Sequence, residues 1–125
     1  MSNDPVFVVV FDPVRNLVST RFTGAVTGAA LQTAAAQVEA QLPQLKPGFR
    51  VFADFGQVAA MDLDCMIPLT RIMDLYRERA VGLVVRILPP KERDIGINLL
   101  SVVHYRGKVK TVTVDTAADA ERVLR

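Results

Sequence analysis

Short segments rich in β-branched and aromatic residues recur along the chain, separated by longer segments with helical periodicity. The short segments predict five strands: Val6–Phe11, Leu17–Thr23, Phe49–Phe55, Val81–Leu88 and Lys108–Val114. The first two flank the turn Asp12-Pro13-Val14-Arg15-Asn16 and predict an antiparallel hairpin, which Gly24 ends. The two internal segments, 49–55 and 81–88, are apolar at nearly every position, which is typical of strands buried on both faces. Lys108 and Lys110 place the last strand at an edge of the sheet.

Apolar side chains spaced three or four residues apart predict helices between these strands. The expected helices are Thr27–Leu42, a second that Met61–Asp64 opens and that runs to about Arg79, Asp94–Tyr105, and a short one that begins at Thr116. Thr27 suits the N-cap of the first helix, and Pro43 ends it. Because helices separate the strands after the hairpin, the order ββαβαβαβα predicts one α/β domain over residues 1–125. Its sheet is expected to be mixed and mostly parallel, with helices on its faces.

The composition supports a folded core and excludes several classes of site. Half of the 125 residues are apolar and the net charge is only +2, which rules out a disordered chain. A single Cys excludes an intramolecular disulfide and multi-cysteine metal sites, and a single His removes most zinc-hydrolase chemistry. We therefore expect no metal and no other cofactor. The longest apolar run, Val6–Phe11, is far shorter than the ~20 residues of a membrane helix, and no signal peptide is recognisable. A cytoplasmic protein without membrane insertion is expected.

The element order, with a hairpin first and a strand–loop–helix around residues 54–65, resembles the STAS domain. This family includes anti-sigma-factor antagonists of the SpoIIAA type and the cytoplasmic tails of sulfate transporters. In its phosphorylatable members, a strand ending in Asp is followed by a loop reading roughly Asp-Ser-Ser-Gly, which opens the second helix. Here Asp54-Phe55-Gly56-Gln57-Val58 resembles the strand end, and Asp62-Leu63-Asp64-Cys65 occupies the Ser-bearing segment. Both serines are absent, so a partner surface at this loop is expected to lack control by phosphorylation there.

The residues Asp62, Asp64 and Cys65 form the candidate partner-binding site that the resemblance implies. The two aspartates sit where a helix begins, where carboxylates cap free N–H groups and complement the helix dipole. Alternatively, Asp64 is a fixed negative charge that imitates phosphoserine in part. Plain capping is the favoured interpretation. A helix N-terminus lowers the pKa of a thiol, whereas two neighbouring aspartates raise it, so Cys65 is interpreted as a small buried core residue.

A second candidate site lies at the carboxyl edge of the predicted parallel strands, where open α/β sheets bind ligands. Asp54 ends one buried strand, while Arg86 and Asp94 accompany the next, so these three side chains mark a ligand edge. No Walker loop and no GxGxxG, GxSxG or HExxH pattern occurs, so no reaction can be assigned to this edge. His104 has no acidic or cysteine companions and is interpreted as a capping or packing residue rather than a catalyst.

Positive charge is concentrated between residues 77 and 110, where eight Lys and Arg outnumber three acidic residues for a net charge of +5. Such a segment could attract an acidic protein, a phosphate or nucleic acid. Its only aromatic residue is Tyr105, so it lacks the stacking platform of single-strand binders. An ordinary solvated face is the favoured interpretation, and no nucleic-acid partner is expected.

Three functional hypotheses follow from these patterns. The first is a non-enzymatic regulatory or protein-interaction module of the STAS type, which binds a partner protein through residues 62–65. The second is a carrier for a small apolar ligand or lipid, with its pocket between the second and third helices. An enzyme comes third, because no nucleophile, base and oxyanion donors converge in the sequence. The sequence leaves a homodimer open.

Overall fold

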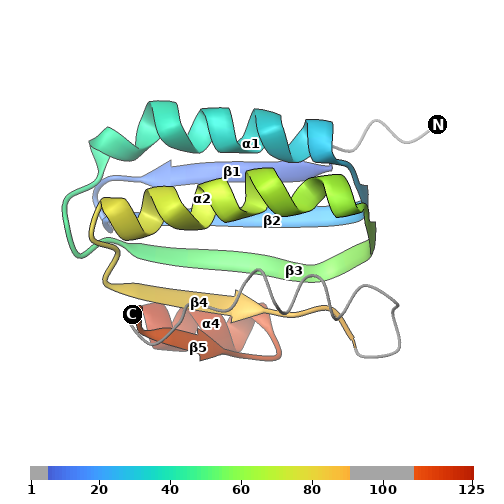
Figure 1. Ribbon diagram of the computed structural model, residues 1–125. Coiled ribbons are helices and arrows are strands. Elements are labelled where there is room, and N and C mark those ends of the chain that lie inside the picture. Colours follow the sequence, from blue (N-terminus) through green and yellow to red (C-terminus); the bar gives the residue numbers. More distant parts are fainter. Residues whose placement is uncertain (1–5, 91–108) are drawn as a thin grey trace.

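One mixed sheet organises the chain, and the computed structural model describes residues 6–90 and 109–125 of it. Across these residues the strands follow the spatial order β1-β2-β3-β4-β5 (Figure 1). Their bounds are β1 (Phe7–Asp12), β2 (Leu17–Val26), β3 (Arg50–Met61), β4 (Leu83–Ile87) and β5 (Thr111–Thr113). β1 pairs with β2 in antiparallel fashion and every later pair is parallel. The predicted hairpin and the mixed, mostly parallel sheet are confirmed.

Helices cover both faces of this sheet (Figure 1). α1 (Gly28–Gln41) and α2 (Met66–Glu78) lie side by side on one face, and the short α4 (Ala117–Leu124) packs on the other. Two 3₁₀ turns, Leu42–Gln44 and Leu63–Cys65, follow α1 and precede α2. No helix among the described residues is long and apolar enough to cross a membrane. The helix expected over 94–105, with Asp94 and His104, lies outside the described residues.

Side chains at the helix ends explain where the helices begin and stop. The Thr27 hydroxyl accepts a hydrogen bond from the Ala30 N–H at 3.2 Å, and the Thr116 hydroxyl accepts one from the Asp119 N–H at 3.1 Å. Each bond satisfies an N–H that the helix itself leaves free. Pro43 lies in the 3₁₀ turn that ends α1, and Pro68 lies in the first turn of α2, where its missing N–H costs little. The N-cap predicted at Thr27 and the predicted start of the last helix at Thr116 are confirmed.

The core has two parts, one on each face of the sheet. The larger part joins α1 and α2 to the central strands, and its fully buried members include Phe22, Leu31, Val38, Phe49, Val51 and Val58. The smaller part lies beneath α4 and consists of Leu17, Val85, Ala120 and Leu124. Apart from Arg86, β4 is apolar because it contributes to both parts, as the sequence pattern predicted.

Two strand ends differ from the sequence-based prediction. β2 does not end at Gly24 but runs on to Val26, and β3 does not end near Phe55 but continues to Met61. The cause is a pair of irregularities in the β2–β3 ladder, which appear as register shifts after Arg21 and after Gly24. Gly24 adopts a φ of 69°, so it accommodates an irregularity within the strand instead of terminating it.

The last two strands are shorter than predicted. β4 covers Leu83–Ile87, and β5 is reduced to three residues at the edge of the sheet. The edge position is as expected, with Lys110 directly before the strand; its carbonyl accepts a hydrogen bond from the Val84 N–H at 2.9 Å. Lys108 lies outside the described residues. A short, lysine-flanked strand is a common way to limit pairing at a sheet edge.

Truncating the anchor of α4 is expected to destabilise the protein strongly. Leu124 is 1% exposed in the smaller core, so Leu124→Ala should lower the free energy of unfolding by about 2–5 kcal/mol. The neighbouring Val123 is 38% exposed, and Val123→Ala should cost less than about 1 kcal/mol. Urea unfolding followed by circular dichroism measures both. Equal losses for the two variants would show that α4 is not anchored through Leu124.

Candidate functional site

The segment between β3 and α2 presents apolar and acidic side chains together. β3 ends at Met61, Asp62 follows it, and the 3₁₀ turn Leu63–Cys65 leads into α2. Leu63 is 67% exposed and Ile67, in the first turn of α2, is 81% exposed. Asp62 and Asp64 are exposed beside them. We call these four residues, Asp62, Leu63, Asp64 and Ile67, the α2 N-terminal surface.

Cys65 ties this segment to the end of β2. Its side chain is 1% exposed, and its Sγ donates a hydrogen bond to the Val26 carbonyl at 3.3 Å. The Cys65 N–H donates to the Asp62 carbonyl at 3.0 Å, and the Asp62 N–H donates to the Val26 carbonyl at 3.4 Å. The interpretation of Cys65 as a buried core residue is confirmed. Cys65 therefore positions the α2 N-terminal surface rather than forming part of its exposed area.

The environment of Cys65 disfavours its thiolate. Burial raises the pKa of the thiol above its ordinary value, because the charged form loses its hydration. The Asp62 backbone hydrogen bond opposes this shift, while the negative charges of Asp62 and Asp64 add to it. The balance keeps the thiol protonated near neutral pH.

The capping interpretation is wrong for Asp62, whereas Asp64 lies in the first turn of the 3₁₀ segment. Asp62 occupies the N-cap of the 3₁₀ turn, but its side chain makes no cap hydrogen bond. The N-cap of α2 itself is Cys65, which also provides no side-chain cap. The physical reason is the inserted 3₁₀ turn, which places Asp62 ahead of the first α-helical turn and satisfies the Cys65 N–H with a backbone carbonyl.

Gly28 brings the start of α1 against the same segment. A Cβ atom at Gly28 would lie 2.7 Å from Asp64 Cβ and 2.9 Å from the Asp64 carbonyl oxygen. Only a residue without a side chain allows this approach. The sequence places Gly28 directly after the N-cap Thr27, with no sign of the contact, because its partner is 36 residues away.

The exposed apolar residues of this surface were not singled out by sequence reasoning. Ile67 falls on the side of α2 opposite the buried stripe that contains Leu69, Ile72 and Tyr76. The position of Ile67 outside the buried stripe of α2 could have predicted its exposure from the sequence, because that side of the helix does not face the core. Leu63 carries a weaker signal, its position between two aspartates.

The second candidate site does not assemble as its sequence positions suggested. In the β3–β4 ladder, Ala53 pairs with Arg86 and Asp54 pairs with Ile87. Because paired residues share a face and neighbours alternate, Asp54 and Arg86 point to opposite faces of the sheet. Asp94 lies outside the described residues. Within the described part of the chain, no group of three or more His, Cys, Asp or Glu side chains is placed to hold a metal ion.

Asp54 instead stabilises the irregular part of β3. It is 7% exposed, and its Oδ1 accepts a hydrogen bond from the Gly56 N–H at 2.9 Å. Its Oδ2 lies 3.5 Å from Arg21 Nε across the β2–β3 ladder. The register shift after Arg21 lies beside it. The Asp54 carboxylate thus satisfies a backbone N–H at the irregularity, which explains a buried acid in mid-strand.

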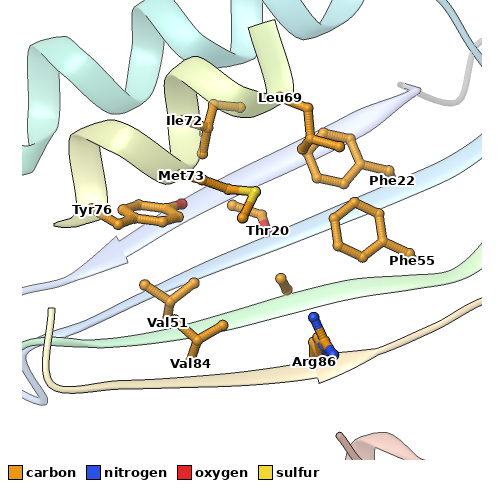
Figure 2. Close-up of a pocket in the computed structure, with 11 residues that line it drawn as sticks. Thr20, Phe22, Val51, Phe55, Leu69, Ile72, Met73, Tyr76, Val84 and Arg86 are labelled. Carbon is orange, nitrogen blue, oxygen red and sulfur yellow. The ribbon is translucent and has the colours of Figure 1, made fainter. Parts of the chain in front are cut away.

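A small cavity lies between α2 and the sheet (Figure 2). Its walls are mostly apolar, with Phe22 and Phe55 stacked at a centroid distance of 5.3 Å and Arg86 at its rim. The free space of this cavity is about 30 Å³, enough for one or two water molecules. Pockets for small organic ligands typically measure about 300–1,000 Å³. The cavity beneath α2 therefore adds no support for a carrier function.

Comparisons with known proteins identify the fold. No protein-family profile and no curated protein matches the sequence. The unphosphorylated form of the anti-sigma factor antagonist SpoIIAA superposes with a TM-score of 0.62 at 16% identity, covering 94% of this chain and 96% of that one. An uncharacterised DUF3478-family protein with a SpoIIAA-like fold, from Shewanella loihica PV-4, superposes with a TM-score of 0.63 at 12% identity, covering 100% of this chain and 98% of that one. The chain has a SpoIIAA-like fold, as the resemblance to STAS domains implied.

Adding a methyl group at Gly28 is expected to disturb the contact with Asp64. Gly28→Ala should lower the free energy of unfolding by about 1–3 kcal/mol, because steric overlap outweighs the gain of about 1 kcal/mol in helix propensity. Ala29→Ser adds one atom at the exposed neighbouring position and should change stability by less than about 0.5 kcal/mol. Chemical denaturation measures both variants. A Gly28→Ala protein as stable as the parent would mean that the contact has no steric consequence.

The single thiol is expected to react slowly in the folded protein. Burial and the raised pKa of Cys65 should reduce its rate with a disulfide reagent at pH 7.5 by at least about 100-fold relative to the urea-unfolded chain. Raising the pH past the ordinary thiol pKa of 9.0 should let the rate of the unfolded chain level off, whereas the native rate should keep rising because the native pKa is higher. Absorbance of the released thiolate follows both reactions. Equal native and unfolded rates would contradict the placement of Cys65.

Proposed function

We propose that this SpoIIAA-like domain is a non-enzymatic regulatory module that binds a partner protein through the α2 N-terminal surface. The observation that carries the proposal is the pair of large apolar side chains, Leu63 and Ile67, exposed in the same short segment as Asp62 and Asp64. Burying one such side chain at an interface is worth about 1.5–3 kcal/mol. Apolar anchors bordered by polar groups are the usual arrangement of a protein-binding site.

The rigidity of the segment supports this role. The Cys65 thiol and the Asp62 N–H both donate hydrogen bonds to the Val26 carbonyl. Gly28, at the start of α1, packs against Asp64. A surface that is already ordered loses little conformational entropy on binding. The shared fold adds support, since SpoIIAA is an anti-sigma factor antagonist, a regulator of another protein.

The charge of the surface is proposed to be permanent. The positions that resemble the Ser-bearing segment read Leu63 and Asp64, so they offer no hydroxyl for phosphorylation. A carboxylate carries a charge of about −1, against about −1.5 to −2 for a phosphate, and it cannot be removed by a phosphatase. The partner is therefore expected to present Lys or Arg beside an apolar pocket, because like charges would be rejected.

Two substitutions separate the apolar contribution from the electrostatic one. The partner is first captured from the native host with the full chain and identified by mass spectrometry of the intact complex. Ile67→Ser should then raise the dissociation constant by about 10–100-fold, through lost apolar burial. Asp64→Asn should raise it by only a few-fold at low salt and flatten its dependence on salt. Isothermal titration calorimetry at two salt concentrations measures both effects.

Val14 supplies the matched control. It is 96% exposed in the turn between β1 and β2, at the opposite end of β2 from the α2 N-terminal surface (Figure 1). Val14→Ser should leave the dissociation constant unchanged. If Ile67→Ser and Asp64→Asn behave like this control, the partner binds elsewhere and the proposed surface is wrong.

A further inference from the structure

β1 is an exposed edge strand without the usual protection against pairing. It lies at one margin of the sheet, and among the described residues it pairs only with β2 (Figure 1). Its central residues, Phe7-Val8-Val9-Val10-Phe11, contain no charge, proline or glycine. The opposite edge, β5, is three residues long and follows Lys110. Edge strands that do not pair are normally shortened, charged or interrupted, so β1 has the composition of a strand that accepts a neighbour.

The ladder between β1 and β2 determines which backbone groups of β1 point outward. The Thr23 N–H donates to the Val6 carbonyl at 2.8 Å, and this pair continues the register in which Phe7 opposes Phe22. In an antiparallel ladder, residues bond to the partner strand at every second position. Val8 and Val10 therefore direct their N–H and C=O groups towards β2. Those of Phe7, Val9 and Phe11 point away from the sheet.

We propose that this edge binds a second copy of the chain, with the two β1 strands paired antiparallel about a two-fold axis at Val9. With outward groups at positions 7, 9 and 11, this pairing sets Val9 opposite Val9 and Phe7 opposite Phe11. About six hydrogen bonds would form, two at each pair. The sequence from Phe7 to Phe11 reads the same in both directions, so the antiparallel arrangement matches each side chain with its own type.

The side chains of β1 on the face of the sheet that carries α4, called here the open face, support the same register. Val8 is 44% exposed and Val10 is 53% exposed, because α4 covers the sheet only near Leu17 and Val85. In the proposed pairing, Val8 of each copy lies beside Val10 of the other, at the closer, non-hydrogen-bonded spacing of an antiparallel ladder. Four exposed valines would then shield one another from water. β-branched side chains suit such a contact, because they pack well against neighbours on a pleated surface.

The charges beside this edge favour a second copy over a charged partner. Glu39 is the only charged residue of α1, and it pairs with Arg71 of α2 at 2.9 Å, on the side of α1 away from β1. Asp12, the only charged residue of β1, would lie opposite Val6 of the second copy. Among the described residues, the proposed pairing brings no two like charges together, and apart from Asp12 this edge carries no unpaired charge that would favour an oppositely charged partner. This surface shares no residue with the α2 N-terminal surface, so the two proposals are independent.

Paired substitutions on the open face test both the contact and its register. Val8→Glu with Val10→Glu would set two carboxylates side by side at each of the two cross-copy contacts. Val8→Glu with Val10→Lys would set a carboxylate beside an ammonium at the same places. In either variant the new carboxylate at position 8 faces Arg21 within its own sheet, so the fold tolerates it. Val14→Lys, in the exposed turn, controls for added charge.

Sedimentation equilibrium of the full chain over a concentration series measures the mass of the associated species and the dissociation constant of each variant. We expect the wild type, the Val14→Lys control and the Glu/Lys variant to associate to twice the chain mass. The Glu/Glu variant should show a dissociation constant raised at least about 100-fold, since adjacent like charges cost several kcal/mol. A wild-type chain that stays monomeric into the millimolar range overturns the proposal, as does a Glu/Glu variant that dimerises normally. A Glu/Lys variant as weak as Glu/Glu refutes the register about Val9.

Discussion

The parallel pairing of β2 with β3 is the constraint on which the rest of the described structure depends. It runs from Leu17 opposite Arg50 to Val26 opposite Met61, well past the end of β4. Because the two strands are parallel and end together, α1 and α2 both start at the same end of the sheet. Gly28 therefore meets Asp64, and the Cys65 thiol reaches the Val26 carbonyl. The position of the α2 N-terminal surface follows from this ladder rather than from the helix itself.

The same ladder explains a buried carboxylate that has no ligand to bind. The first irregularity of the β2–β3 ladder follows directly after the pair Arg21 and Asp54. There Asp54 accepts a hydrogen bond from the Gly56 N–H and faces Arg21 on the adjacent strand. Both carboxylate oxygens are used, which offsets the cost of burying the charge. An acid in mid-strand is here part of the fold.

The two proposed surfaces occupy different parts of the sheet and have different physical characters. The α2 N-terminal surface combines two apolar side chains with two permanent negative charges, so it selects a partner by charge as well as by shape. The β1 edge offers uncharged backbone groups and valines, so it selects an identical strand. If both proposals hold, each copy of a two-fold assembly presents its own α2 N-terminal surface, and the residues of that surface lie away from the contact between copies.

Much of this fold could be predicted from the sequence. The features that could not be predicted have one physical cause in common, namely their dependence on contacts between distant segments. Local patterns of the sequence predicted the hairpin, the parallel order of the later strands, the cap at Thr27, the start of the last helix at Thr116 and the burial of Cys65. The strand ends past Gly24 and Phe55 depend on a register between segments about 30 residues apart, which no local pattern contains. The pairing of β3 with β4, which no local pattern contains either, places Asp54 and Arg86 on opposite faces of the sheet. For Leu63 and Ile67 the sequence holds only a partial signal, and the tertiary structure decided their exposure, because the burial of a side chain depends on which distant segment packs over it.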